Sequence, residues 1–434
     1  MADVNRRTAY FILKDVEENR AYSNVAVGNH IARLRPDSPP FVRELTYGVL
    51  RRRITLDYYI SQFVKTPMWK IRIPDTILLR MGLYQIIYMN SVPEYAAVNE
   101  TVSMAKKFAP GRDGFINGVL RSYLRDRDYI ELPSKEGDLT NHLSVKYSYE
   151  PWIVDMWLCE YGAEETERLL EAGDVQPPLI VRVNTLKTNV ENLKSRLEKR
   201  GWTVNEGKYP ERTLYLEGGP VLSDSLFESG LFSVQDDAAL EVVNVLGAKP
   251  GETIIDVCAA PGGKTGAIAE DMQNAGRIIA IDLYKRKLKL IEDQMARLDI
   301  SIVDTRDWDS TVPISEFADK ADRVLVDVPC SGLGTVRHKP EIKYKEWGPA
   351  LEELPGKQLD ILTASASYVK PGGVLVYSTC TIAKRENEQV IQAFLKAAPE
   401  FERIEARQLL PDKDGMDGFF ICKMQRKDTF DRDR

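Results

Sequence analysis

The chain has 434 residues, of which 43% are hydrophobic and 29% are charged, and its formal net charge is −6. This length leaves room for about two to four domains, and the composition is that of a globular protein rather than a disordered one. Because no apolar run approaches the roughly 20 residues that cross a bilayer, and the start of the chain shows no signal-peptide core, we expect a cytoplasmic protein without a membrane span.

The front of the chain is expected to be all-helical. From residue 7 to about residue 128 the apolar residues recur at helical spacing, and three prolines fall between the periodic stretches, where they suit helix starts and stops. Residues 1–140 carry a charge balance of +5, whereas the remainder carries −11. We therefore predict a helical domain over 1–140 whose basic excess fits a polyanion partner, although solvated helix faces would give similar counts.

A second region begins after a polar stretch at 132–141, which predicts a linker. Residues 178–184 have the pattern of a strand, and residues 190–200 that of a helix ended by Gly201. These features predict a small α+β subdomain, together with its connections, over residues 141–240.

The last region, residues 241–434, alternates solid apolar runs with amphipathic helices. The expected strands are 253–257, 277–282, 323–327 and 374–377. Apolar runs without alternation are typical of strands buried on both faces, as in a parallel sheet between two layers of helices. The fold predicted here is an α/β, Rossmann-like, doubly wound domain with a mainly parallel sheet.

The loop after the first of these strands is rich in glycine and reads DVCAAPGGKT at 256–265. A phosphate-binding P-loop would need glycine at position 258, which is Cys258, and the dinucleotide fingerprint would need a third glycine that is missing. The next expected strand ends at Asp282, where a carboxylate can accept from both ribose hydroxyls. An adenosine ligand without a pyrophosphate fits this pattern, and S-adenosylmethionine is such a ligand. A structural turn beside an exposed acid is the alternative.

One further strand is expected after the strand that ends at Asp282, and it is followed by three acids between 304 and 309. Asp307, or less favourably Asp304, is placed to accept from the amino group of an adenine.

Two further expected strands end close to a cysteine each, Cys330 and Cys380, and Asp327 closes the first of them. A single buried cysteine is usually a small hydrophobic residue, but two beside a cofactor loop suit methylation of a pyrimidine at C5. A thiolate adds to C6, a carboxyl group stabilises the developing charge, and C5 then attacks the methyl group. The chain has no CxxC pair and only three scattered histidines, so we expect free thiols and no metal.

These segments resemble a known family. DVCAAPGGKT at 256–265, DRVLVDVPCSGLGTVRHKPEIKY at 322–344 and GGVLVYSTCTIAKRENEQV at 372–390 are similar to the motifs of RNA (cytosine-5)-methyltransferases. Among these, the chain most resembles the bacterial Fmu/Sun-type enzymes, which are RsmB-like and act on 16S ribosomal RNA. The resemblance covers nearly the whole chain and implies a class I methyltransferase domain.

The resemblance also implies roles for individual residues. Cys380 would be the nucleophile, Cys330 would assist release of the product, and Asp327 would contact the base edge and the cofactor region. The residues implied for S-adenosyl-L-methionine binding are Cys258, Ala259, Ala260, Pro261, Gly262, Gly263, Lys264, Asp282, Asp307 and Asp327. Cys159 and Cys422 match no nucleophile position.

The front domain resembles the NusB-type helical RNA-binding fold, through VRELTYGVLRRRITLDYYI at 42–60, LRMGLYQIIYMNSVPEYAAVNETVSMAKK at 79–107 and FINGVLRSYLR at 115–125. Basic residues of this domain and of the stretch beyond Cys330 are the candidates for phosphate contacts. These RNA-binding candidates are Arg51, Arg52, Arg53, Lys106, Lys107, Arg121, Arg125, Arg127, Arg337, His338 and Lys339.

The expected partner is 16S ribosomal RNA, and we expect a monomer. Two alternatives stay open from the sequence. The catalytic motifs would also suit a transfer RNA substrate, although the front domain argues against it. A non-catalytic RNA-binding assembly factor could keep the same cofactor fold.

Overall fold

The computed structural model describes residues 3–217, 221 and 224–428. Its contacts divide the chain into two compact units. The first contains the chain up to Val175 together with Val336–Glu346, and the second contains Gln176–Thr335 and the chain from Trp347 onward. The first division therefore falls at residue 175, whereas the sequence pattern placed a linker near residue 140.

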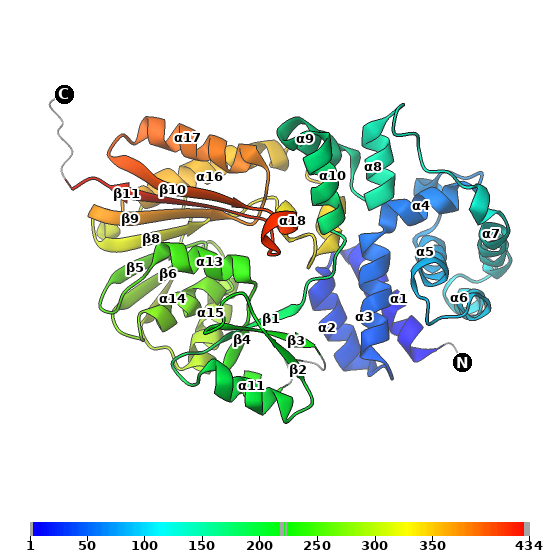
Figure 1. Ribbon diagram of the computed structural model, residues 1–434, viewed down its shortest axis with the longest axis horizontal. Coiled ribbons are helices and arrows are strands. Elements are labelled where there is room, and N and C mark those ends of the chain that lie inside the picture. Colours follow the sequence, from blue (N-terminus) through cyan, green and yellow to red (C-terminus); the bar gives the residue numbers. More distant parts are fainter. Residues whose placement is uncertain (1–2, 218–220, 222–223, 429–434) are drawn as a thin grey trace. The chain divides into compact units, whose positions relative to one another are not determined.

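The first unit is helical, as predicted (Figure 1). Its α-helices are α1 (Val4–Asn19), α2 (Ser23–Leu34), α3 (Pro39–Arg51), α4 (Arg53–Ser61), α5 (Ile73–Tyr88), α6 (Glu94–Phe108), α7 (Asp113–Asp126), α8 (Leu139–Tyr147), α9 (Pro151–Tyr161) and α10 (Ala163–Ala172). Local signals set their starts: Asp3 caps α1 by accepting from two backbone N–H groups, and Pro74 occupies the first turn of α5. In the described part of the chain no helix has the length and apolar character of a membrane span.

The segment 336–346 joins the first unit although its neighbours in the chain belong to the second. Lys343 is fully buried, and its Nζ donates to the carbonyl oxygens of Arg51 and Tyr147 at 3.0 and 3.2 Å. These two residues end α3 and α8, where helix C-termini leave unpaired carbonyls that favour a cation. Lys343 also lies 4.0 Å from the ring centroid of Tyr149.

The second unit begins with a small antiparallel sheet in the order β2-β3-β1-β4. Its elements are β1 (Leu179–Val183), α11 (Val190–Glu198), β2 (Thr203–Glu206), β3 (Thr213–Glu217), α12 (Ser225–Glu228) and β4 (Phe232–Val234). The predicted strand and helix of the α+β subdomain correspond to β1 and α11. Residues 141–175, which the sequence pattern grouped with this subdomain, form α8, α9 and α10 and cluster with the first unit.

The large sheet has seven strands in the order β10-β11-β9-β8-β5-β6-β7. The remaining elements are α13 (Asp237–Leu246), β5 (Thr253–Val257), α14 (Gly263–Asp271), β6 (Arg277–Asp282), α15 (Lys285–Leu298), β7 (Val303–Asp307), β8 (Ala321–Asp327), α16 (Ala350–Ala366), β9 (Val369–Thr379), α17 (Glu388–Ala397), β10 (Phe401–Leu409), α18 (Pro411–Asp414) and β11 (Phe419–Arg426). Strands β5 to β9 pair in parallel, and β11 runs antiparallel between β9 and β10. This confirms the predicted doubly wound fold.

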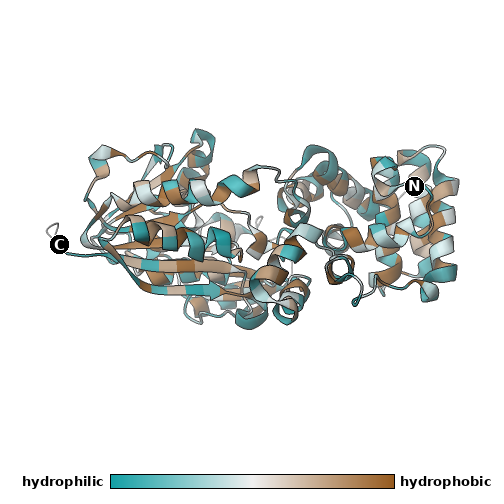
Figure 2. Ribbon diagram, turned by 90° about the horizontal axis from the view of Figure 1, so that it is seen from above, coloured by the Kyte–Doolittle hydropathy of each residue, from teal (hydrophilic) through white to brown (hydrophobic). Residues whose placement is uncertain are grey.

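Helices cover both faces of this sheet, as its apolar runs predict (Figure 1). Residues of α13, α14 and α15 form one hydrophobic cluster with one face of the strands, and residues of α16 and α17 form another cluster with the opposite face. In β5, Ile254 belongs to the first cluster and Ile255 to the second. Figure 2 shows that the central strands are mostly hydrophobic, whereas the helices around them carry both kinds of residue.

A buried ion pair links the small sheet to the cofactor-loop helix. Arg182 of β1 is fully buried, and its guanidinium donates to both carboxylate oxygens of Glu270 at 2.9 and 2.8 Å. The same guanidinium donates to the carbonyl oxygen of Gly263 at 2.8 Å, in the first turn of α14. Because Glu270 is 3% exposed, removal of either partner leaves an uncompensated charge inside the protein.

We predict that Glu270→Ala lowers the free energy of unfolding of the second unit by about 3–5 kcal/mol, since Arg182 then stays buried without its carboxylate. The measurement is the urea unfolding midpoint of the full chain. The matched control is Glu316→Ala, which removes the exposed partner of Arg306 and should cost at most about 1 kcal/mol. Equal losses in the two variants would contradict the prediction.

Candidate active site

The glycine loop connects the end of β5 to the start of α14, where the sequence places it. Gly262 has φ +98°, a conformation that L side chains rarely adopt, and an added Cβ would lie 3.3 Å from the backbone of Ile291. The first turn of α14 leaves backbone N–H groups without intrahelical acceptors. Such a turn can bind a carboxylate.

The predicted acids lie at neighbouring strand ends. Asp282 and Asp307 are register partners at the carboxyl ends of β6 and β7, and Asp282 is 5% exposed whereas Asp307 is exposed. Asp304 lies three residues earlier in β7, and its carboxylate pairs with Arg277 at 2.9 Å. Of the two acids, Asp307 is therefore the one that lies at the strand end next to Asp282.

Asp256 lies at the same edge of the sheet. It is the first residue of the loop motif, and the sequence predicts no role for it. Its Oδ2 accepts from the Thr265 hydroxyl at 2.6 Å, and its buried Oδ1 has no hydrogen-bond partner among the described residues. Burial raises the pKa of Asp256 to about 7. An unpaired buried oxygen, a glycine cradle and a strand-end acid together fit an adenosine ligand with an amino-acid tail.

The two predicted cysteines meet at the ends of adjacent parallel strands. Asp327 of β8 and Ser378 of β9 are register partners, and Cys330 and Cys380 follow them within three residues. Their Sγ atoms are 3.3 Å apart. Both side chains are half-buried, so the pair is neither enclosed in the core nor fully open to water.

Asp327 lies between a lysine and a hydroxyl group. Lys264 Nζ donates to Asp327 Oδ2 at 2.6 Å, and Ser378 Oγ donates to Asp327 Oδ1 at 2.6 Å. Burial alone would lower the pKa of Lys264, but the adjacent Asp327 carboxylate holds that pKa above its usual value. Lys264 is therefore a cation fixed by Asp327, and Cys380 is among the groups that act on its pKa.

The two thiols differ in their surroundings. The hydrogen bond to Cys380, followed by burial, raises the pKa of Cys330 well above its usual value, so Cys330 remains a thiol at neutral pH. The negative form of Cys380 is among the charges that favour the Lys264 cation. A thiolate at Cys380 would thus be stabilised by a cation and by a thiol donor.

The other cysteines have no such setting. Burial, reinforced by Asp282, raises the pKa of Cys258 to about 12, which agrees with a packing role in the loop. Cys422 is buried, and Cys159 is exposed in the first unit.

Backbone contacts that the sequence did not reveal hold the two cysteine loops together. Gly334 N–H donates to the Cys380 carbonyl at 3.0 Å, and Gly418 N–H donates to the Gly334 carbonyl at 2.8 Å. An added Cβ on Gly334 would lie 1.8 Å from the Gly418 carbonyl oxygen, so only glycine fits there. The buried Glu386 accepts from the Ser331 N–H at 2.9 Å. The signals in the sequence for these contacts are two glycines and one acid that follow the cysteines, Gly334, Gly418 and Glu386.

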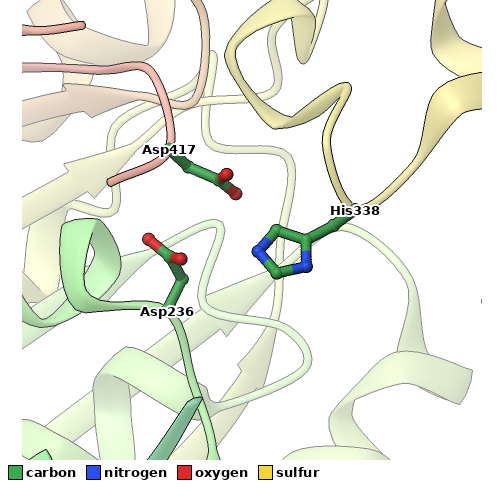
Figure 3. A group of neighbouring side chains, drawn as sticks. All are labelled: Asp236, His338 and Asp417. Carbon is green, nitrogen blue, oxygen red and sulfur yellow. The ribbon is translucent and has the colours of Figure 1, made fainter. Parts of the chain in front are cut away.

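Two acids of the second unit also face each other. Figure 3 shows the carboxylates of Asp236 and Asp417 turned toward one another, and their nearest ligand atoms lie within 4.8 Å. Asp236 caps α13 by accepting from the Ala238 N–H at 2.8 Å. His338, which the figure also draws, belongs to the first unit and is not counted with this pair.

The predicted RNA-binding residues divide into three groups. Arg51 and Arg337 are each 8% exposed, and Arg52 pairs with Asp174 at 2.9 Å. Arg51 and Arg337 are therefore buried and Arg52 is ion-paired, so these three are less accessible to a phosphate than the exposed candidates are. The group that is exposed in the first unit comprises Lys106, Lys107, Arg121, Arg125 and Arg127. Arg53, His338 and Lys339 are half-buried.

Family models match most of the chain. Residues 243–425 match the model described as 16S rRNA methyltransferase RsmB/F, residues 3–125 match the NusB family, and residues 149–221 match the ferredoxin-like domain of RsmF/B-like methyltransferases. These matches cover the large sheet, the front helices and the small sheet.

Relatives and solved structures agree with these matches. The probable ribosomal RNA small subunit methyltransferase B of Bacillus subtilis is 36% identical, with 97% of this chain and 98% of the relative covered. The Vibrio cholerae ribosomal RNA small subunit methyltransferase B is 32% identical, with 91% of each covered. The crystal structure of PH0851 has a TM-score of 0.83 at 25% identity and covers 97% of this chain and 99% of that one.

A methyltransferase homologue from Pyrococcus horikoshii has a TM-score of 0.58 at 29% identity, covering 67% of this chain and 99% of that chain. The glycine loop, the paired cysteines and the helical front domain thus occur in a chain that matches one family from end to end. The chain belongs to the RsmB/F family of 16S rRNA methyltransferases.

Proposed function

We propose that this protein transfers a methyl group from S-adenosyl-L-methionine to C5 of a cytosine in 16S ribosomal RNA, in the cytoplasm, through a covalent adduct between Cys380 and C6 of the base. The observation that carries the proposal is the 3.3 Å contact between the Cys330 and Cys380 sulfur atoms beside the Lys264–Asp327 pair. Family membership supplies the class of reaction and the RNA.

The residues around the glycine loop would hold the cofactor, which supplies a methyl group on a positively charged sulfur when bound. The first turn of α14 would bind its carboxylate. Asp282 would accept from the ribose hydroxyls, and Asp307 would accept from the adenine amino group. The glycine loop follows β5, and Asp282 and Asp307 end the next two strands of the sheet, β6 and β7, so one bound ligand would reach all three.

Cys380 would act first, by adding its sulfur to C6 of a cytosine that has left its stack. The Lys264 cation and the Cys330 thiol favour the thiolate that makes this attack. The Asp327 carboxylate would contact the base edge by accepting from its exocyclic amino group, and the Lys264 cation paired with it would oppose the negative charge that develops at N3. Addition at C6 makes C5 electron-rich, so that C5 takes the methyl group.

The last step removes the C5 proton and expels Cys380 as a thiolate, which restores the C5–C6 double bond. The Cys330 Sγ atom lies 3.3 Å from the Cys380 Sγ atom. We assign it to this release step, because its thiol lies where it can exchange a proton or hydrogen-bond with the leaving sulfur.

Cys380→Ala should reduce methyl transfer to 16S ribosomal RNA by at least about a thousandfold, because the electron-poor ring then has no nucleophile. The measurement is incorporation of labelled methyl groups, with bisulfite sequencing to locate the base. The matched control is Cys422→Ala, since Cys422 is buried in the sheet away from the loop. Retained transfer by Cys380→Ala would overturn the nucleophile assignment.

Cys330→Ala should trap a covalent protein–RNA adduct, because attack by Cys380 persists whereas release slows. The adduct is measured as a shifted band on a denaturing gel that disappears after nuclease treatment. The double variant Cys330→Ala/Cys380→Ala should give no such band. Fast turnover without adduct in Cys330→Ala would contradict its role in release.

Asp282→Asn should weaken binding of S-adenosyl-L-methionine by about ten- to a hundredfold, because charge-assisted hydrogen bonds to the ribose become neutral ones. Isothermal titration with cofactor alone measures this, and Asp304→Asn is the control, since Asp304 pairs with Arg277. Wild-type protein that binds no cofactor would instead favour a non-catalytic assembly factor.

A further inference from the structure

The connection between α4 and α5 in the first unit carries charge of a single sign. Residues 62–74 read QFVKTPMWKIRIP, with three basic residues and no acid. Lys65, Lys70 and Arg72 are exposed, and Arg72 also pairs with Asp75 at 2.9 Å. No ion pair to Lys65 or Lys70 is present among the described residues, so both cations are available to an anion.

An unusual aromatic residue lies in the same connection. Trp69 is 78% exposed on a short 3-10 helix, Met68–Lys70, and Lys70 Nζ lies 4.6 Å from its ring centroid. A large indole left in water forgoes the gain from burial, and contiguous exposed apolar surface often marks a binding site. Ile73, the first residue of α5, is 42% exposed beside it.

A cavity of about 360 Å³ opens next to this indole. Trp69, Met68 and Ile71 line its apolar side. Its polar side is rigid: Arg80, only 6% exposed, donates to both carboxylate oxygens of Asp57 at 2.7 Å and to Glu17 at 2.6 Å. Arg53, one of the predicted RNA contacts, also lines the cavity.

This combination has the chemistry of a nucleotide site. A planar base can stack on an indole, its exocyclic amine can donate to a carboxylate, and its flanking phosphates can pair with lysines. The two carboxylates of the cavity are paired with Arg53 and Arg80, which also line it, so the cavity carries both signs of charge. A base can donate to such carboxylates, and Lys65 and Lys70 are not among the residues that line the cavity.

We propose that Trp69, Lys65 and Lys70 form a binding site for an unpaired nucleotide of the ribosomal RNA substrate, separate from the site of methyl transfer. The proposal rests on the proposed function only for the identity of the RNA. It adds a stacking contact to the phosphate contacts expected from the exposed basic residues of the first unit. The site would act on RNA affinity rather than on chemistry.

The test measures binding without cofactor, by fluorescence anisotropy of a labelled single-stranded RNA of about twelve nucleotides, and of the same sequence as a duplex. Trp69→Ala should weaken single-strand binding by about ten- to a hundredfold, the size expected for one stacked base. Trp69→Phe should retain most of the affinity, and the preference for single strand over duplex should fall only in Trp69→Ala. Tyr129→Ala, which removes another exposed ring of this unit, should bind like the wild type.

The double variant Lys65→Met/Lys70→Met tests the phosphate contacts. The slope of log Kd against log salt concentration should fall by about 0.7 for each lost contact. An unchanged slope would overturn this part of the proposal. Equal binding by Trp69→Ala and wild type, or equal losses in Trp69→Ala, Trp69→Phe and Tyr129→Ala, would overturn the stacking site.

Photocrosslinking of wild-type protein to RNA that carries 4-thiouridine needs no variant and decides the matter if Trp69→Ala unfolds. Crosslinks in the peptide that spans 66–72 support the site, and crosslinks confined to other peptides overturn it. Methyl transfer enters none of these measurements. The proposed reaction fails if Cys380→Ala keeps its methyl-transfer activity, whereas this site fails if Trp69→Ala binds RNA like the wild type. The two failures are therefore distinguishable.

Discussion

The register between two neighbouring parallel strands is the constraint on which the site depends. Asp327 of β8 lies opposite Ser378 of β9, and the loops that follow this pair bring Cys330 and Cys380, 50 positions apart in the chain, to a sulfur–sulfur distance of 3.3 Å. A slip of one residue would turn the following side chains to the other face of the sheet. The apolar runs on both faces, which form two separate hydrophobic clusters, prevent that slip. The core therefore sets the geometry of the cysteine pair as well as the stability.

Burial then gives the two thiols different tasks. Asp327 accepts from Lys264 at one carboxylate oxygen and from Ser378 at the other, and it thereby keeps the Lys264 cation in place. The same partly dry surroundings hold the Cys330 proton on its sulfur. One fixed cation and one retained thiol proton both favour negative charge on the remaining sulfur, at Cys380. The distinction between the two cysteines thus follows from their neighbours, since their positions at strand ends are nearly equivalent.

The parts of the fold that follow from solid apolar runs could be predicted, and the parts governed by edges and by long-range packing could not. Strands β5, β6 and β8 lie where the sequence pattern indicates, because each is buried on both faces. Strand β7 reads VDTRD and is mostly exposed at the sheet edge, so it gives no apolar signal.

The basic run at 51–53 has the pattern of a phosphate-binding cluster, but consecutive helical residues point in different directions. One of the three, Arg51, therefore had to face inward. Segment 336–346 follows a catalytic motif in the chain, yet Lys343 is bound by helix ends of the first unit.

Net charge differs along the sequence, since residues 1–140 carry +5 and residues 141–434 carry −11. Binding of a polyanion depends on the local patch of charge rather than on such a sum. A catalytic site that admits a single unstacked base needs little phosphate contact of its own, because the cost of leaving the stack can be met by binding elsewhere on the same RNA. The connection between α4 and α5, with three cations, no acid and an exposed indole, has the composition that such a contact requires. If that connection binds RNA, substitutions there change KM for the RNA while the rate at saturation stays constant, because no reacting atom is touched.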